Sequence, residues 1–275
     1  MKYSFTCDLH GHSYYSDGKC SPSEISNIAF ELGINIVALT DHDLTYGLDE
    51  FETSIQKLNE NGKDIIGIPG IEVTTEDGHI ILLFSNTKDA KEFSETVHIE
   101  EKNDLKTVIK NSSKYNKYII IPHVEIPYIG SFSFETLAKF FKDFPKEMLH
   151  TGLEVINGES LVMPRFLLKK HRTLEDLNEN HGWNRSLFAN SDHHSKHGIG
   201  VGVTEIKSDK EVKNAKEFIE LLKTSSGGEA KTQKILSKTE LLIEYFYIIS
   251  GVIRKRVALL FPGLPRFRKR QTITV

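Results

Sequence analysis

The chain has 275 residues, of which 39% are hydrophobic and 27% are charged. This length lies within the range of a single α/β barrel, and the composition excludes a wholly disordered chain. Two cysteines are too few for a disulfide framework. A formal net charge of −3 excludes a basic field over the whole molecule that would hold nucleic acid.

The sequence predicts a cytoplasmic protein. No signal peptide is expected, because the first residues lead directly into a polar segment without an apolar stretch. The longest apolar candidate for a membrane span, 241–253, is too short and contains a glutamate and a serine. The small number of cysteines fits a reducing compartment.

Short apolar runs of strand length alternate with longer amphipathic stretches along the chain. The expected strands are 5–9, 34–40, 64–69, 72–75, 80–84, 118–122, 153–156 and 186–190. The expected helices are 22–32, 48–61, 104–116, 134–144, 161–180 and 210–222. Ser21 and Glu24 predict a capping box at the first helix, and Gly33 marks its end.

The repeated order of strand and helix predicts a mainly parallel sheet with crossover helices. The runs 72–75 and 80–84 are expected to pair around the turn 76–78. At this length we expect a distorted (β/α) barrel, with an open doubly wound sheet as the alternative. We expect residues 1–230 to form the barrel and residues 231–275 to form a C-terminal helical tail.

The tail differs in charge from the rest of the chain. It contains seven basic residues after position 244: Arg254, Lys255, Arg256, Arg266, Arg268, Lys269 and Arg270. No acidic residue lies among them, so the first 244 residues carry a net charge of −10. The apolar face of 241–249 is expected to pack on the barrel. The alternatives are a membrane-surface or protein contact and guidance of a nucleic-acid backbone.

Five groups of His, Asp and Glu stand at or just after the ends of expected strands. They are Asp8-Leu9-His10-Gly11-His12 with Asp17, Asp41-His42-Asp43, Glu72 with His79, Pro122-His123, and Asp192-His193-His194. Strand ends of a barrel converge on one mouth, so these groups predict a metal site there. On an extended strand His10 and His12 point to the same face and can bind one ion. Imidazole and carboxylate ligands without thiolate fit Mn²⁺, Fe²⁺ or Zn²⁺.

The series resembles the motifs of the polymerase and histidinol phosphatase (PHP) superfamily. The matching motifs are Asp8-x-His10-x-His12, Ser16-Asp17-Gly18, Thr40-Asp41-His42-Asp43, Gly70-Ile71-Glu72-Val73, Pro122-His123 and Ser191-Asp192-x-His194. The resemblance covers about residues 3–205. It implies a distorted (β/α)7 barrel with a trinuclear metal centre and hydrolysis of phosphoesters. Within the superfamily, the chain is most similar to the small stand-alone phosphoesterases.

The resemblance also implies three sets of metal ligands for two to three divalent ions (Mn²⁺, Fe²⁺ or Zn²⁺). The first set is His10, His12, Glu72 and Asp192; the second is Glu72, His79 and His123, with Glu72 as the bridge; the third is Asp17, His42 and His194. The first set is expected to be catalytic through a hydroxide that bridges the ions and attacks phosphorus. His79 matches by its position after Glu72 alone.

Two further residues are candidates for contact with the substrate. Arg165 could bind a phosphate, with a surface or helical role as the alternative. His197 could contact the phosphate or protonate the leaving group; like His193, it could instead be exposed or lie behind the ligands. Only 43 residues separate His79 from His123, so a substrate-capping insertion is expected to be small or absent.

These observations predict a metal-dependent phosphoesterase that hydrolyses phosphomonoesters, with a nucleotide-like small molecule as the substrate. The alternative is a 3′–5′ exonuclease or oligoribonuclease that trims short RNA or DNA, which the basic tail favours and the acidic body opposes. A third hypothesis is a non-catalytic metal-binding module. The complete set of ligands argues against it.

Overall fold

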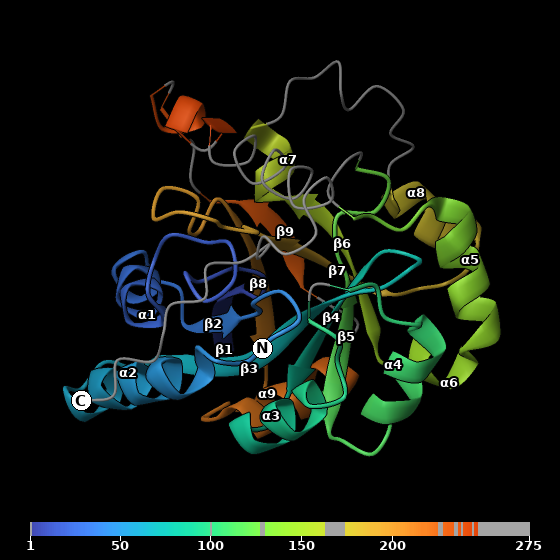
Figure 1. Ribbon diagram of the computed structural model, residues 1–275. Helices are drawn as coiled ribbons and strands as arrows, with labels where there is room; N and C mark the ends of the chain where they lie inside the picture. Colours follow the sequence, from blue (N-terminus) through green and yellow to red (C-terminus); the bar gives the residue numbers. More distant parts are fainter. Residues whose placement is uncertain are drawn as a thin grey trace.

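A computed structural model describes residues 2–99, 101–126, 130–162, 174–224 and 228–246, apart from 234, 235, 238 and 244 (Figure 1). Arg165 and the tail beyond residue 246 lie outside the described residues. The strands are β1 (Tyr3–Asp8), β2 (Ile36–Leu39), β3 (Ile66–Thr74), β4 (His79–Phe84), β5 (Lys117–Ile121), β6 (Thr151–Asn157), β7 (Ser186–Asn190), β8 (Gly202–Ser208) and β9 (Glu229–Thr232).

The helices alternate with the strands along most of the chain. They are α1 (Pro22–Glu31), α2 (Leu48–Glu60), α3 (Thr87–Ser94), α4 (Leu105–Ser112), α5 (Phe134–Asp143), α6 (Pro145–Met148), α7 (Gly158–Val162), α8 (Leu174–Asn180) and α9 (Ala215–Thr224). Ser21 and Glu24 form the expected capping box at α1, and Gly33 follows the helix at a φ of 75°.

The strands form one sheet in the order β7-β6-β5-β4-β3-β2-β1-β8-β9. The sheet curls until its parts meet: Gly11, after β1, bridges to His193, after β7, and the Thr204 side chain of β8 bonds the backbone of Ala189 in β7. The result is a nearly closed barrel with helices around it. The expected distorted α/β barrel is therefore confirmed.

The directions of the strands differ in part from the expected parallel arrangement. The pairs β1–β2, β2–β3, β5–β6 and β6–β7 are parallel. The pairs β3–β4, β4–β5, β1–β8 and β8–β9 are antiparallel. The expected strands 64–69 and 72–75 are one strand, β3, which pairs with β4 as predicted. The strands β8 and β9 were not predicted, and β9 extends past residue 230.

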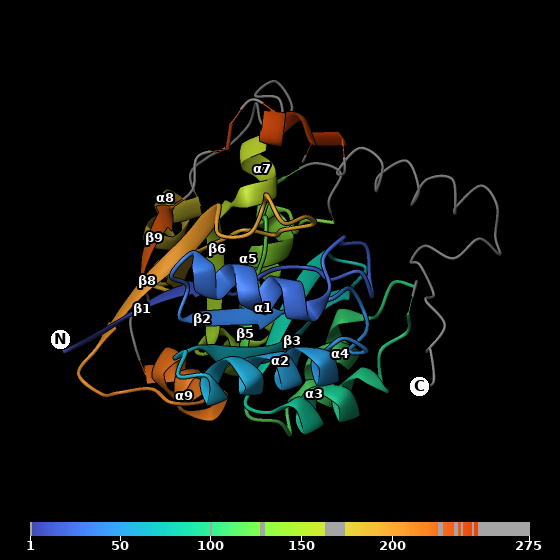
Figure 2. The same cartoon turned by 90° about the vertical axis from the view of Figure 1, so that its left-hand side faces the viewer.

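Two apolar cores follow from the alternation of side chains along the strands. Ile36 and Ala38 of β2 point into the barrel, whereas Val37 and Leu39 pack against the outer helices. Helix α9 closes the barrel interior with Phe218, Ile219 and Leu222. Figure 2 shows α9 at the end of the barrel opposite to α7. The open end is therefore the one at which β1, β2, β5, β6 and β7 terminate.

Within the described residues, none of the helices combines the length and the apolar character needed to cross a bilayer. Cys7 and Cys20 are both buried and carry free thiols. The expected long helix at 161–180 is represented by the end of α7 and by α8, between which residues 163–173 lie outside the described part.

Candidate metal centre

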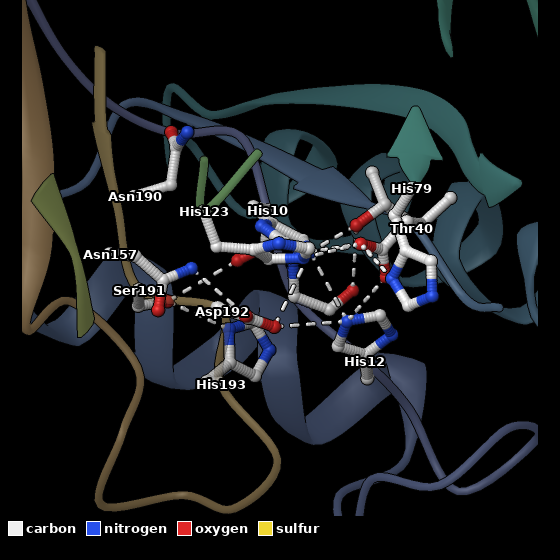
Figure 3. A network of polar contacts seen from close by, with 12 residues as sticks. His10, His12, Thr40, His79, His123, Asn157, Asn190, Ser191, Asp192 and His193 are labelled. Carbon is white, nitrogen blue, oxygen red and sulfur yellow. Dashed lines mark hydrogen bonds and ion pairs between the residues drawn. The ribbon is translucent and has the colours of Figure 1, made fainter. Parts of the chain in front are cut away.

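All nine predicted ligands gather at the open end of the barrel. His10, His42, His123 and Asp192 follow β1, β2, β5 and β7, and Glu72 lies near the end of β3. His79 opens β4, which runs antiparallel and therefore starts where its neighbours end. Figure 3 shows the imidazoles of His10, His12, His79 and His123 converging with Asp192.

Glu72 lies at the middle of the cluster and is fully buried. Its Oε1 is 3.0 Å from both His79 Nδ1 and His123 Nε2. Its Oε2 is 2.9 Å from His42 Nδ1 and 3.3 Å from His12 Nε2. One carboxylate thus faces imidazoles from four segments, as a bridging ligand would.

Asp192 forms the second acidic contact of the cluster. Its Oδ1 is 3.1 Å from His12 Nε2 and 3.3 Å from His10 Nε2. Its Oδ2 accepts a hydrogen bond from Asn157 Nδ2 at 2.9 Å. The backbone N–H of Asp192 donates to the carbonyl of His10 at 2.9 Å, so the same bridge that closes the barrel places these two side chains together.

Asp17 brings together the residues of the third expected set. Its Oδ1 is 3.3 Å from His194 Nε2, and its Oδ2 is 3.7 Å from His42 Nε2. The ring of His12 stacks on His42 at 4.4 Å between centroids. The possible ligand atoms of His12, Asp17, His42 and His194 all lie within 4.8 Å of one another. His12 therefore lies between the first and third sets.

Backbone strain marks the loops that carry the ligands. His123 and Asp192 have φ angles of 36° and 49°, and Asp43, next to His42, has a φ of 56°. The left-handed region is unfavourable for residues with a Cβ, and such residues are concentrated at functional sites. The side chain of Asp43 accepts a hydrogen bond from Thr74 N at 2.6 Å, which holds this turn against β3.

Several residues behind the ligands were not singled out from the sequence. Glu154 of β6 is 3.1 Å from His10 Nδ1 through Oε2 and accepts a hydrogen bond from Asn157 through Oε1. Asn190 donates to the same carboxylate at 2.8 Å. Glu154 is an acidic residue in a strand otherwise rich in apolar residues, which is the signal that could have identified it.

Asp41 shapes the loop between His12 and Asp17. Its carboxylate accepts hydrogen bonds from the backbone N–H of Ser13 at 2.7 Å and from the hydroxyls of Ser13 and Ser16 at 2.7 and 2.5 Å. Burial raises the pKa of Asp41, and these hydrogen bonds oppose that shift. Asp41 acts on this loop, because its hydrogen bonds go to Ser13 and Ser16.

The charges of the cluster follow from burial and mutual proximity. Burial opposes ionisation of Glu72 and Asp192, but the neighbouring imidazoles outweigh it and hold the pKa of both carboxyls well below the usual range. Burial, with His42 and His194 nearby, lowers the pKa of His12 to about 4. For His194, burial is outweighed by Asp17 and other acids, and the pKa rises to about 10. Glu72, Asp192 and His12 are therefore in the deprotonated forms that bind metals.

The residues present fit divalent ions. Among the described residues, His12 Nδ1 is buried and has no hydrogen-bond partner. Glu72 Oε2 forms no hydrogen bond either, although nitrogens of His12 and His42 lie within 3.3 Å. An unsatisfied buried polar atom costs about 1–3 kcal/mol. Ligand atoms around an ion lie close together without forming hydrogen bonds to one another, as these atoms do. The donor set suits Mn²⁺, Fe²⁺ or Zn²⁺.

His197, one of the two candidates for contact with the substrate, is not among the grouped ligand residues. His197 Nδ1 is 3.3 Å from Glu240 Oε1, in the described start of the tail, and its side chain is 27% exposed. His193 is buried, packs its ring against Gly11 and has Nδ1 3.0 Å from Ser191 Oγ. Arg165 lies outside the described residues.

Comparison with known proteins identifies a family model and solved structures that are similar to this chain. Residues 8–126 match the family model of the PHP domain. A two-domain protein from Bacteroides vulgatus that contains a predicted PHP-like metal-dependent phosphoesterase is 19% identical, with a TM-score of 0.61 over 89% of this chain and 69% of that chain. An amidohydrolase from Chromobacterium violaceum, solved with bound sulfate and no metal, is 15% identical, with a TM-score of 0.53 over 83% and 98%. At these identities the likeness concerns the fold.

Curated relatives match a shorter stretch. A 5′-3′ exoribonuclease of Haemophilus influenzae is 41% identical over 68 residues, which are 25% of this chain and 23% of that protein. The 5′-3′ exoribonuclease Rnm of Escherichia coli is 32% identical over 73 residues, or 26% and 24% of the two chains. The matched stretches span about a quarter of the length of these relatives.

Proposed function

We propose that this chain, whose residues 8–126 match the family model of the PHP domain, is a metal-dependent hydrolase of phosphomonoesters with a nucleotide-like substrate. The observation that carries the proposal is the position of Glu72. Its two oxygens face imidazoles from four segments of the barrel mouth at 2.9–3.3 Å. Such a convergence is what a cluster of ions requires, and paired ions are a recurrent solution to phosphoryl transfer.

The ligand sets proposed from the resemblance account for the contacts. Glu72 would be shared between ions held by the first set (His10, His12, Glu72 and Asp192) and the second set (Glu72, His79 and His123). Asp17, His42 and His194 would hold a third ion. When bound, the ions would supply Lewis acidity toward a phosphate ester and activate water at neutral pH.

The ionisation and orientation of the ligand side chains would support this hydrolysis. The low pKa values of Glu72 and Asp192 keep both carboxylates ready to bind cations at neutral pH. Glu154 fixes the ring of His10 through Nδ1 and leaves Nε2 facing Asp192 and Glu72. Partners of this kind orient the ligands and raise their basicity.

The decisive experiment compares two substrates in one reaction. The protein loaded with Mn²⁺ is incubated with an equal amount of a nucleoside monophosphate and a short RNA that carries a 5′ label, and the products are resolved by chromatography. The proposal predicts phosphate release from the nucleotide and intact RNA. His10→Ala should abolish release, whereas the exposed His98→Ala should retain it.

A second candidate is favoured by the names of the curated relatives, which are 5′-3′ exoribonucleases. Their polarity is opposite to that of the 3′–5′ exonuclease expected as the alternative. In the same reaction this candidate predicts that the RNA is shortened from its labelled 5′ end and that this shortening requires His10. Bound Mn²⁺ without any product would instead support the metal-binding module.

A further inference from the structure

The junction between β6 and α7 is tied directly to the candidate metal centre. Asn157 ends β6, and its Nδ2 donates to Glu154 Oε1 at 2.6 Å and to Asp192 Oδ2 at 2.9 Å. Its Oδ1 accepts from the backbone N–H of Ser160 in α7 at 2.9 Å. One side chain thus joins the first turn of α7 to a carboxylate of the cluster.

Gly158 allows α7 to begin against the segment that follows β7. A Cβ at this position would lie 2.4 Å from the carbonyl oxygen of Ser191 and 3.0 Å from its Cα. A contact of 2.4 Å with the backbone leaves no room for any larger residue. The close approach brings the next residue, Glu159, beside Asp192 and His194.

Glu159 is half-buried at the mouth of the barrel. A carboxylate oxygen of Glu159 and possible ligand atoms of Asp192 and His194 all lie within 4.8 Å of one another. No sequence motif assigns a metal ligand between His123 and Asp192. We infer that Glu159 is a further ligand of the metal centre, acting with Asp192 and His194 where the first and third sets meet.

The inference rests on the proposed metal centre and makes it more specific. The second set contains two imidazoles and one carboxylate. The group of Glu159, Asp192 and His194 contains two carboxylates and one imidazole. Carboxylates suit Mn²⁺, whereas imidazole-rich sites suit Zn²⁺ and Fe²⁺. The ion beside Glu159 should therefore show a stronger preference for Mn²⁺ than the ion of the second set.

Measuring Mn²⁺ binding in the absence of substrate tests the role of Glu159. Chelated protein is titrated with Mn²⁺, free Mn²⁺ is followed by electron paramagnetic resonance, and bound Mn²⁺ is counted by atomic emission. Glu159→Gln should lose one class of Mn²⁺ sites or weaken it at least about tenfold, since even residues behind the ligands contribute about 10–100-fold. The other classes should be unchanged. Glu175→Gln, which alters an exposed acid of α8, is the matched control.

Two outcomes separate this inference from the proposed function. A wild-type protein that binds no Mn²⁺ would refute the metal centre itself. A wild-type protein that binds Mn²⁺, with an identical titration for Glu159→Gln, would overturn only the role of Glu159. Glu159→Asp is a second variant for the case in which the first does not fold. It keeps the charge but shortens the side chain, so the affected class should persist with weaker affinity, and an unchanged titration would again overturn the inference.

Discussion

At the scale of single residues, Glu154 is a buried carboxylate that connects several of the strand ends around the metal centre. Its Oε2 lies 3.1 Å from His10 Nδ1 and accepts from Asn190 at 2.8 Å. Its Oε1 accepts from the backbone N–H of His123 at 3.2 Å. The ends of β1, β5, β6 and β7 therefore converge on one side chain. The ligand rings depend on Glu154 for their orientation.

We predict that Glu154→Gln weakens Mn²⁺ binding about 10–100-fold, as the loss of an orienting partner does elsewhere. The amide keeps the shape of the side chain but replaces one acceptor oxygen with a donor, so an existing hydrogen bond must break. Isothermal titration calorimetry of the chelated protein measures the change. The exposed Glu135→Gln serves as the control. Equal affinities for Glu154→Gln and the wild type would show that Glu154 does not orient His10.

The sequence predicts ligands better than it predicts the residues behind them. His42, His123 and Asp192 could be recognised because polar residues at the ends of apolar runs are unusual. Glu154 and Asn157 lie within β6, and their partners come from β1, β5 and β7. Which residues meet across such distances is decided by how the sheet closes, and no local pattern carries that information.

At the scale of elements, the closure of the barrel depends on the contact between the ends of β1 and β7. Gly11 bridges to His193, and the N–H of His12 donates to the carbonyl of His193 at 3.0 Å. A Cβ on Gly11 would lie 1.8 Å from the ring of His193. The ring therefore fills the space that the glycine leaves.

Gly11→Ala should destabilise the metal-free protein by about 1–3 kcal/mol, the usual cost of overpacking a tight contact. Urea unfolding measures this free energy. In the His193→Ala background the same substitution should cost less, because the ring that it meets is gone. Residues in contact commonly show coupling of about 0.5–3 kcal/mol in such a cycle. An identical cost in both backgrounds would mean that the clash does not govern closure.

The order of elements could be predicted from the sequence to a larger extent than their directions. Apolar runs identified β1 to β7, and the turn at 76–78 identified the antiparallel β3–β4 pair. The antiparallel β4–β5 pair has no such local turn, because α3 and α4 intervene. The strand β8 pairs with β1 across about 200 residues, and its run Gly202–Ser208 mixes apolar and charged residues. Pairing of this kind is a tertiary property.

At the scale of the whole molecule, the two ends of the barrel have opposite characters. Helix α9 closes one end with fully buried Phe218 and Ile219, each of which contributes about 1.5–3 kcal/mol through burial. The other end holds buried carboxylates and imidazoles, with some polar atoms unsatisfied. Burial of apolar side chains at one end thus offsets the cost of the buried polar cluster at the mouth, which is unfavourable without cations.

Metal ions should therefore stabilise the entire fold. An ion that binds only the folded state, at a free concentration 100 times its Kd, raises the free energy of unfolding by about 2.7 kcal/mol. For a domain of this size that corresponds to an increase in Tm of about 5–10 °C. Differential scanning calorimetry of Mn²⁺-loaded and chelated protein measures the difference. His10→Ala, which removes a ligand, should show a smaller increase, and equal Tm values for loaded and chelated wild type would contradict the prediction.

The increase in Tm that Mn²⁺ produces should depend on pH, and the protonation of His194 should set the direction of this dependence. Asp17 and its acidic neighbours outweigh burial and raise the pKa of His194 from a reference near 6.5 to about 10. The protonated imidazole therefore stabilises the chelated protein fully below pH 6.5, and this contribution is lost as the pH rises toward 10. A metal ion must displace that proton, so its binding strengthens over the same window. The difference in Tm should grow between pH 6.5 and 8.5, and a difference that shrinks would show that the proton on His194 does not oppose binding.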